Sequence, residues 1–225
     1  MSLKIGNGRA IAKWAIISII GILMLVFVVK TAVWEKEYYD SKEGSERAIV
    51  MDMGDDLIEE APSEQEVSEY TVAPDRPRYL TIDRLGIKNA RILPMGINAE
   101  GELTTPNNIF DVGWYDGSGK PGQGGTLLVD GHNGGPHVQG VFKALPSLGM
   151  GDIVVVERGD GKIFRYSVVE NKSVPLSESN DYMATAMMSP MKGKESITLI
   201  SCAGEWSQAQ KTYLSRQFVR AILTE

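Results

Sequence analysis

The stretch TLISCAGEW, residues 198–206, places the only cysteine of the chain, Cys202, at the end of a predicted buried strand. The preceding run, 196–201, is rich in β-branched and aliphatic side chains, which favour strands. After a short connection, SRQFVRAIL forms a second apolar run over 215–223. Two neighbouring runs of this kind predict a pair of antiparallel strands at the end of the chain.

Short apolar runs separated by Gly, Asn, Asp and Pro fill residues 78–225. Strands are predicted at 79–82, 90–94, 126–130, 152–158, 162–172, 196–201 and 216–223. The turn sequence ERGDGK, 157–162, predicts a hairpin, because Asp-Gly favours turns whose twist matches paired strands. Short helical insertions are expected at 141–145 and 181–188. The pattern indicates one all-β domain, a closed or nearly closed β-barrel.

The amino-terminal segment has a different composition. Residues 14–33 are almost wholly apolar and long enough to cross a bilayer, while Lys4, Arg9 and Lys13 precede them. The positive-inside bias predicts a cytoplasmic segment 1–13, an uncleaved single-pass anchor and an extracytoplasmic remainder. A cleaved secretory signal is the alternative, but no small-x-small cleavage site follows.

Residues 34–77 are strongly acidic and account for the negative net charge of the chain, −6. Like charges with little apolar surface predict an extended or partly helical solvated stalk. The alternative is that WEKEYY (34–39) or AIVMDM (48–53) packs on the folded domain as a lid or brace. Neither the net charge nor any cluster of Lys and Arg indicates nucleic-acid binding.

A lone cysteine outside the cytoplasm is buried, paired between molecules, or reactive. A reactive thiol needs a neighbouring base or cation. His132, in LLVDGHNGGP, follows a predicted strand and is flanked by glycines, whereas His137 lies in a Gly/Pro-rich loop and is expected to be exposed. These two histidines and Cys202 match no common zinc motif, so no metal site is predicted.

Attack on an acyl group also requires stabilisation of the carbonyl oxygen. Arg216 begins the last predicted strand, where antiparallel pairing would bring it beside Cys202. Arg220 would share its face about 13 Å further along the strand. Arg216 is therefore the predicted oxyanion partner, and Arg220 is the second candidate, otherwise expected on a solvated barrel exterior.

Taken together, these motifs resemble bacterial sortases. TLISC followed by SRQFVRA is similar to the cysteine and arginine strands of that family, and LLVDGHN to its histidine strand. ILPMGINAEGELTTPNN, VGWYDGSGKPGQGG and VFKALPSLGMGDIVVV are similar to the segments around the histidine. The resemblance runs from about Tyr79 to the end, in the order His, Cys, Arg. Ser201 stands where the family usually has Thr, and no aromatic lid motif is recognisable.

The resemblance implies a closed eight-stranded sortase barrel over 78–225 and a membrane-anchored cysteine transpeptidase. Cys202 would cleave a Leu-Pro-x-Thr-Gly-like sorting signal through a thioester, with His132 as acid and base and Arg216 as oxyanion partner. The acceptor would be the amine of a cell-wall precursor or of a pilin lysine. No cofactor is expected. A non-catalytic binding module that retains the barrel is the alternative function.

Substrate contacts are expected from Thr198 and Ser201 and from the segment VPLSESNDYMATAMMSPMKGKE, 174–195. Its residues Tyr182, Met183 and Met187 fall at helical spacing, and Ser179 or Asn180 is expected to cap the helix. This apolar stripe either only packs the insertion onto the barrel or also forms a wall of the groove for the Leu-Pro end of the signal.

Overall fold

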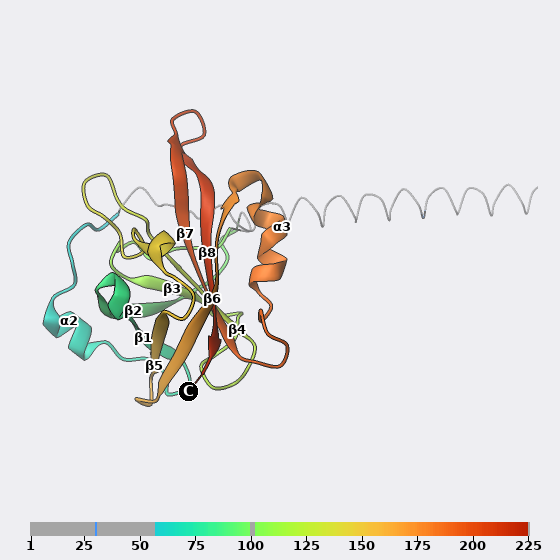
Figure 1. Cartoon of the computed structure of the whole chain (residues 1–225). Coiled ribbons are helices and arrows are strands. Elements are labelled where there is room, and N and C mark those ends of the chain that lie inside the picture. Colours follow the sequence, from blue (N-terminus) through green and yellow to red (C-terminus); the bar gives the residue numbers. More distant parts are fainter. Residues whose placement is uncertain (1–29, 31–56, 100–101, 225) are drawn as a thin grey trace, which may run out of the picture. The chain divides into compact units, whose positions relative to one another are not determined.

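The computed structural model describes residues 30, 57–99 and 102–224 (Figure 1). Two compact units are distinguished, Met1–Glu46 and Arg47–Glu225, and the barrel belongs to the second. The predicted cytoplasmic segment 1–13 and, apart from Lys30, the predicted anchor 14–33 lie outside the described residues. None of the described helices is long and apolar enough to cross a membrane.

Eight strands form a closed barrel, which confirms the predicted fold. The strands are β1 (Pro77–Ile82), β2 (Ile87–Met95), β3 (Val112–Tyr115), β4 (Thr126–Gly131), β5 (Ile153–Arg158), β6 (Ile163–Pro175), β7 (Ser196–Ser207) and β8 (Thr212–Leu223). Their order around the barrel is β1-β2-β3-β4-β7-β8-β6-β5, and β5 pairs with β1 to close it. The β2–β3 and β4–β7 pairs are parallel and all other pairs are antiparallel.

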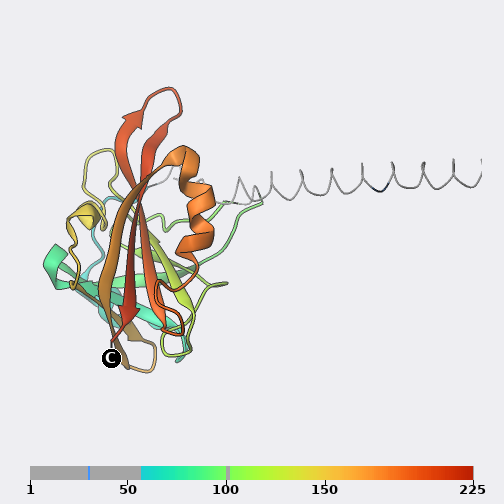
Figure 2. The same cartoon turned by 45° about the vertical axis from the view of Figure 1, so that its right-hand side comes forward.

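Short helices lie outside the strands. They are α2 (Glu64–Glu69), the 3₁₀ turns η1 (Asp83–Leu85) and η2 (Leu145–Ser147), and α3 (Leu176–Ala186). In Figures 1 and 2 the β7–β8 hairpin extends beyond the other strands, and α3 lies along the outside of the barrel beside β6 and β8.

Strand alternation divides the apolar residues of β4 and β7 between two faces. Leu127 and Val129 of β4, with Leu199 of β7, point into the barrel and join its main core. On the opposite face, Leu128 and Ile200 belong to a second cluster that includes Cys202 and is covered by α3. The predicted nucleophile therefore lies outside the barrel core, beneath the α3 insertion.

Several boundaries differ from the sequence prediction. The four-residue strand β3 was missed because Gly113 interrupts a short apolar run. β7 and β8 continue past their predicted limits, so that only residues 208–211 connect them. The predicted helical insertion at 141–145 contains turns and the start of η2. The ERGDGK turn does join β5 to β6 as predicted.

The second insertion is helical, but it begins earlier than expected. Pro175 occupies the N-cap position of α3 and makes no side-chain capping bond, while Ser179 lies within the helix and donates to the carbonyl of Leu176 (2.8 Å). The prediction of a cap at Ser179 or Asn180 was therefore wrong. Proline fixes the backbone in a conformation that suits a helix start, which explains the earlier boundary.

The described part of the acidic segment, 57–77, contacts the barrel rather than extending into solvent. Ile58 exchanges backbone hydrogen bonds with residues 107 and 109 (2.9 and 3.1 Å). The Glu59 carboxylate accepts from the backbone N–H of His137 (2.8 Å), and the Tyr70 hydroxyl donates to the carbonyl of Ile92 (2.6 Å). This part is therefore not a solvated spacer, whereas the predicted packing of WEKEYY or AIVMDM stays a prediction because 34–56 lies outside the described residues.

Candidate active site

Cys202 and Arg216 are directly paired across the β7–β8 hairpin. Cys202 lies within β7 rather than at its end, and Arg216 lies within β8, so the register fixes the pair more rigidly than a loop would. Cys202 is 7% exposed and Arg216 only 1%. In an antiparallel pair, directly opposite residues point to the same face, which places the guanidinium beside the thiol.

His132 follows β4 directly. The parallel register pairs Asp130 with Ile200, and continuing it by two residues brings His132 level with Cys202 on the same face. The imidazole is 4% exposed. The three predicted catalytic residues are therefore contributed by three adjacent strands of the barrel, β4, β7 and β8.

One ring nitrogen of His132 has a defined partner. Its Nε2 lies 2.7 Å from the carbonyl oxygen of Pro106. Because a carbonyl oxygen can only accept, Nε2 must carry a proton, and the neutral ring then has an unprotonated Nδ1. Burial lowers the pKa of His132, and the bond to Pro106 acts in the opposite direction. The neutral imidazole is thus favoured, with Nδ1 available as a base.

The thiol is also favoured in its neutral form. Burial raises the pKa of Cys202, while the Arg216 charge acts to lower it and an ionised Asp130 acts to raise it. A thiolate is the reactive nucleophile. The site therefore rests as a thiol and a neutral imidazole, and ionisation must accompany substrate binding or attack.

Arg216 is held in place and keeps a donor available. One terminal nitrogen, Nη1, donates to the carbonyls of Tyr213 (3.0 Å) and Ser215 (3.1 Å), and Nη2 donates to the Thr212 hydroxyl (3.3 Å). Its buried Nε–H has no acceptor among the described residues. A fixed cation with a free N–H suits an oxygen that gains negative charge.

Arg220, the second candidate, has a structural role. Its Nη1 forms an ion pair with the Glu170 carboxylate (2.6 Å), and Nη2 donates to the carbonyls of Thr185 (3.0 Å) and Met188 (2.8 Å). The expectation of a solvated exterior was wrong, because α3 and the turn after it cover this part of β8. Arg220 attaches the carboxyl end of α3 to the barrel and is directed away from Cys202.

The stripe on α3 packs against the cluster that contains Cys202. Tyr182, Met183 and Met187 are partly buried against this cluster, and the Tyr182 ring meets Phe218 edge-on with centroids 4.8 Å apart. The remaining buried members are Leu103, Leu128, Val174, Ala186 and Ile200. An apolar surface beside the thiol is thus shared by α3, β4, β7 and β8.

Two predicted substrate contacts are engaged within the fold. Ser201 alternates with Cys202, points toward the barrel interior and donates to the carbonyl of Gly131 (2.9 Å). The fully buried Thr198 lies on the same face as Cys202, but its hydroxyl donates to the carbonyl of Ala186 (2.7 Å). Ser201 thus holds β7 to the end of β4, and Thr198 holds α3 on β7.

Asp130 was missed by the sequence prediction. Its carboxyl is 1% exposed and has no hydrogen-bond partner among the described residues. Burial raises its pKa to about 7, while Thr105 acts to lower it. The available signal was a lone carboxylate in the apolar run LLVD, two residues before His132. By contrast, His137 is exposed, as predicted.

The part of the chain that the structure describes contains no group of three or more His, Cys, Asp or Glu side chains that could hold a metal ion. The site is therefore built from a thiol, an imidazole, a guanidinium and one unpaired carboxyl. These groups can perform nucleophilic acyl transfer with general acid–base help.

Comparison with known proteins identifies the family of the domain that holds these residues. Residues 80–224 match the Sortase domain family. No curated protein sequence matches the chain. Similar solved structures include sortase C of Streptococcus pneumoniae, 16% identical with a TM-score of 0.52, over 79% of this chain and 80% of that one. A pilus-related sortase C of Group B Streptococcus is 17% identical with a TM-score of 0.51, over 88% of this chain and 89% of that one.

Identities this low show a shared fold and no more. The family match, in contrast, spans more than half of the sequence and includes the strands that carry His132, Cys202 and Arg216. The chain belongs to the sortase family.

Proposed function

We propose that this chain is a cysteine transpeptidase that cleaves a sorting signal and transfers the acyl group to an amine. The observation that carries the proposal is the direct pairing of Cys202 with Arg216, with His132 directly after β4, the strand that pairs with β7. A buried, positioned guanidinium beside a thiol nucleophile can stabilise the oxyanion that forms in acyl transfer.

In the first half-reaction, Nδ1 of His132 takes the proton of Cys202 as the sulfur attacks the scissile carbonyl carbon. The carbonyl oxygen gains negative charge and accepts a hydrogen bond from the Nε–H of Arg216. When the C–N bond breaks, His132 returns its proton to the departing amine and the acyl group remains on sulfur as a thioester. One residue commonly acts as base and then as acid in such sites.

In the second half-reaction an acceptor amine attacks the thioester. The C–N bond forms, the C–S bond breaks, and the electron pair of the C–S bond returns to sulfur. His132 receives a proton from the amine, and Arg216 again stabilises the oxygen. Water can replace the amine and would release a free acid.

The substrate class is a Leu-Pro-x-Thr-Gly-like sorting signal of a surface protein or pilin. Its apolar end would lie against the Cys202 cluster and the α3 stripe, since adaptable Met side chains suit an apolar pocket. The acceptor is the amine of a cell-wall precursor or of a pilin lysine. We further propose that 14–33 anchors the chain in the cell membrane as a single pass, with 1–13 cytoplasmic and 78–225 outside.

The test is to incubate the chain with a library of sorting-signal peptides and to measure cleavage and acyl-enzyme by mass spectrometry. Wild type should acquire the mass of the acyl fragment on Cys202. Cys202→Ala should show neither cleavage nor adduct and should keep its fold, because the volume removed is small. Substantial turnover by Cys202→Ala would refute Cys202 as the nucleophile.

The burial of Cys202 favours one alternative, a barrel that binds a partner without catalysis. A methanethiosulfonate reagent separates the two functions. Labelling of native Cys202 supports an open catalytic site, whereas labelling only in denaturant supports the binding module.

A further inference from the structure

Asp130 is an unexplained charge beside the catalytic residues. Its side chain points to the same face as that of His132, which follows two residues later in the chain. Neither carboxyl oxygen of Asp130 has a hydrogen-bond partner among the described residues. Other buried carboxylates are paired: Asp111 with Arg91 (2.7 Å), and Glu195 with the Tyr166 hydroxyl (2.7 Å). A buried unpaired carboxyl destabilises the fold, so its presence needs a functional reason.

The surrounding strands leave room for this carboxyl. Gly113 of β3 is the register partner of Asp130, and a Cβ at Gly113 would overlap Oδ1 of Asp130. The same Cβ would lie 2.7 Å from Cγ of Met95 and 3.0 Å from Cδ of Pro106. The glycine thus allows Asp130 to lie beneath the segment that contains Pro106, whose carbonyl binds His132.

Thr105 and Pro106 lie near this carboxyl. The Thr105 hydroxyl is close enough to act on the carboxyl, yet it too is buried without a hydrogen-bond partner of good geometry. The Pro106 carbonyl can accept a second bond. An ionised carboxylate only accepts, and an ammonium group only donates, with three N–H groups. An unpaired carboxylate in this position, beside the proposed base, is complementary to an ammonium ion.

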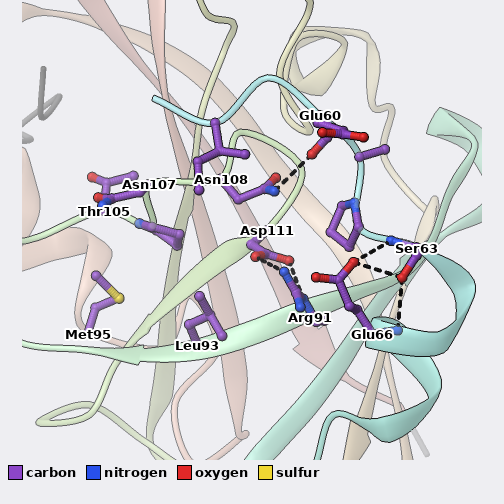
Figure 3. A pocket seen from close by; sticks show the side chains of 14 residues that line it. Glu60, Ser63, Glu66, Arg91, Leu93, Met95, Thr105, Asn107, Asn108 and Asp111 are labelled. Carbon is purple, nitrogen blue, oxygen red and sulfur yellow. Dashed lines mark hydrogen bonds and ion pairs between the residues drawn. The ribbon is translucent and has the colours of Figure 1, made fainter. Parts of the chain in front are cut away.

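The residues near Asp130 also border a cavity of about 630 Å³. Met95, Thr105 and Pro106 line the cavity, and Figure 3 shows Met95 and Thr105 at the end opposite Glu66 and Ser63. The carboxylate of Glu66 at the far end would attract a cation. Thr105 and Pro106 therefore border this acidic cavity and also lie near Asp130 and His132, respectively.

We propose that Asp130, together with Thr105, binds the ammonium form of the acceptor amine in the second half-reaction and so favours amines over water. This inference rests on the proposed transpeptidase function and names the site that selects the acceptor. A lysine-type amine with a pKa of about 10.4 is protonated at neutral pH. It must therefore reach the thioester as a cation before it can lose a proton and attack.

The proton balance of the step is closed by residues of the site. The ammonium is held by the Asp130 carboxylate and passes one proton to Nδ1 of His132. The amine lone pair forms the C–N bond, and the C–S bond breaks with its electron pair on Cys202. The second proton leaves the nitrogen for that thiolate, which gives the amide, the Cys202 thiol and protonated His132. Asp130 stays ionised throughout and is a positioning group for the acceptor.

The experiment measures how the acyl-enzyme of the 225-residue chain divides between acceptors. A Leu-Pro-x-Thr-Gly peptide supplies the acyl group at about pH 7.5, and the acceptors are Nα-acetyl-lysine amide, hydroxylamine and water. Hydroxylamine is neutral at this pH and needs no counter-charge. Asp130→Asn should reduce transfer to the lysine amine about 10- to 100-fold, as expected for loss of a charge-assisted hydrogen bond, and should raise the KM for that amine.

The division of the acyl-enzyme between hydroxylamine and water should stay at the wild-type ratio, because neither acceptor is a cation. Thr105→Val should show a smaller selective loss. The control is Asp116→Asn, an exposed carboxylate just after β3 that removes the same charge without touching the site. If Asp130→Asn divides the acyl-enzyme between the acceptors as wild type does, or loses transfer to lysine amine and to hydroxylamine equally, the inference is wrong but the proposed function is unaffected. Absence of any acyl-enzyme in wild type would instead refute the proposed function.

Discussion

The buried carboxyl of Asp130 should make the stability of the barrel depend on pH. Burial raises its pKa from the ordinary 3.8 to about 7. Between these values the folded chain keeps Asp130 protonated while the unfolded chain does not, so folding takes up a proton. The stability contributed by this group is therefore complete below about pH 4, falls as the pH rises to about 7, and is constant above that.

The size of the effect follows from the same two values. At about 1.4 kcal/mol per pKa unit, the interval from 3.8 to about 7 corresponds to about 4 kcal/mol. This is an upper bound, because a site that relaxes around a charge reduces its cost. The amide introduced by Asp130→Asn also lacks partners, but that cost is the same at every pH. The variant should therefore gain about 2–4 kcal/mol relative to wild type between about pH 4 and pH 7.

Urea unfolding at a series of pH values, followed by tryptophan fluorescence, measures this difference. Trp114 is 1% exposed within the barrel core and should report unfolding. His132 titrates in both chains, so its contribution cancels when the two curves are subtracted. If the free energies of unfolding of wild type and Asp130→Asn run parallel from about pH 4 to pH 8, the reasoning about this carboxyl is wrong.

Three further outcomes are expected. His132→Ala should abolish peptide cleavage nearly as completely as Cys202→Ala, whereas His137→Ala should stay within a few-fold of wild type; the reverse order, in a steady-state peptide assay, would reassign the base. Exchanging 174–195 for the corresponding loop of another sortase should change which peptide is cleaved by about 1–3 kcal/mol of discrimination while the thiol keeps its reactivity; an unchanged preference would leave α3 a packing element only. Removing 57–76, which docks on β2 and on the loops at 107–109 and 137, should lower the Tm by several degrees; an unchanged melting curve would mean that these contacts contribute no stability.

Most of the barrel could be predicted because its strands are separated by strong turn signals. Seven of the eight strands were found from short β-branched runs between Gly, Asn, Asp and Pro. β3 was not, since its four residues include Gly113, which has low strand propensity. The reason for that glycine is tertiary: it makes room for Asp130, which lies on another strand. Local patterns contain no such information.

The catalytic arrangement was predicted in part. Strand pairing was enough to bring Arg216 beside Cys202, because the two runs lie next to each other in sequence. The faces were harder to assign. Thr198 and Ser201 were grouped as substrate contacts, yet alternation sends Ser201 into the barrel, and α3 takes the Thr198 hydroxyl. Arg220 was expected in solvent because nothing in its own strand indicates that the end of α3 lies over it.

The charges of the site are divided between its two flanks in a way that suits a two-step transfer. In the proposed reaction the carbonyl oxygen becomes negative in both half-reactions, so the permanent cation of Arg216 on β8 would serve both. A positive charge arrives only with the acceptor amine, and Asp130 lies on the β4 flank with His132, where protons are exchanged. An ionised Asp130 opposes the Cys202 thiolate. A protonated Asp130 should therefore favour thioester formation, and an ionised one should favour capture of the amine.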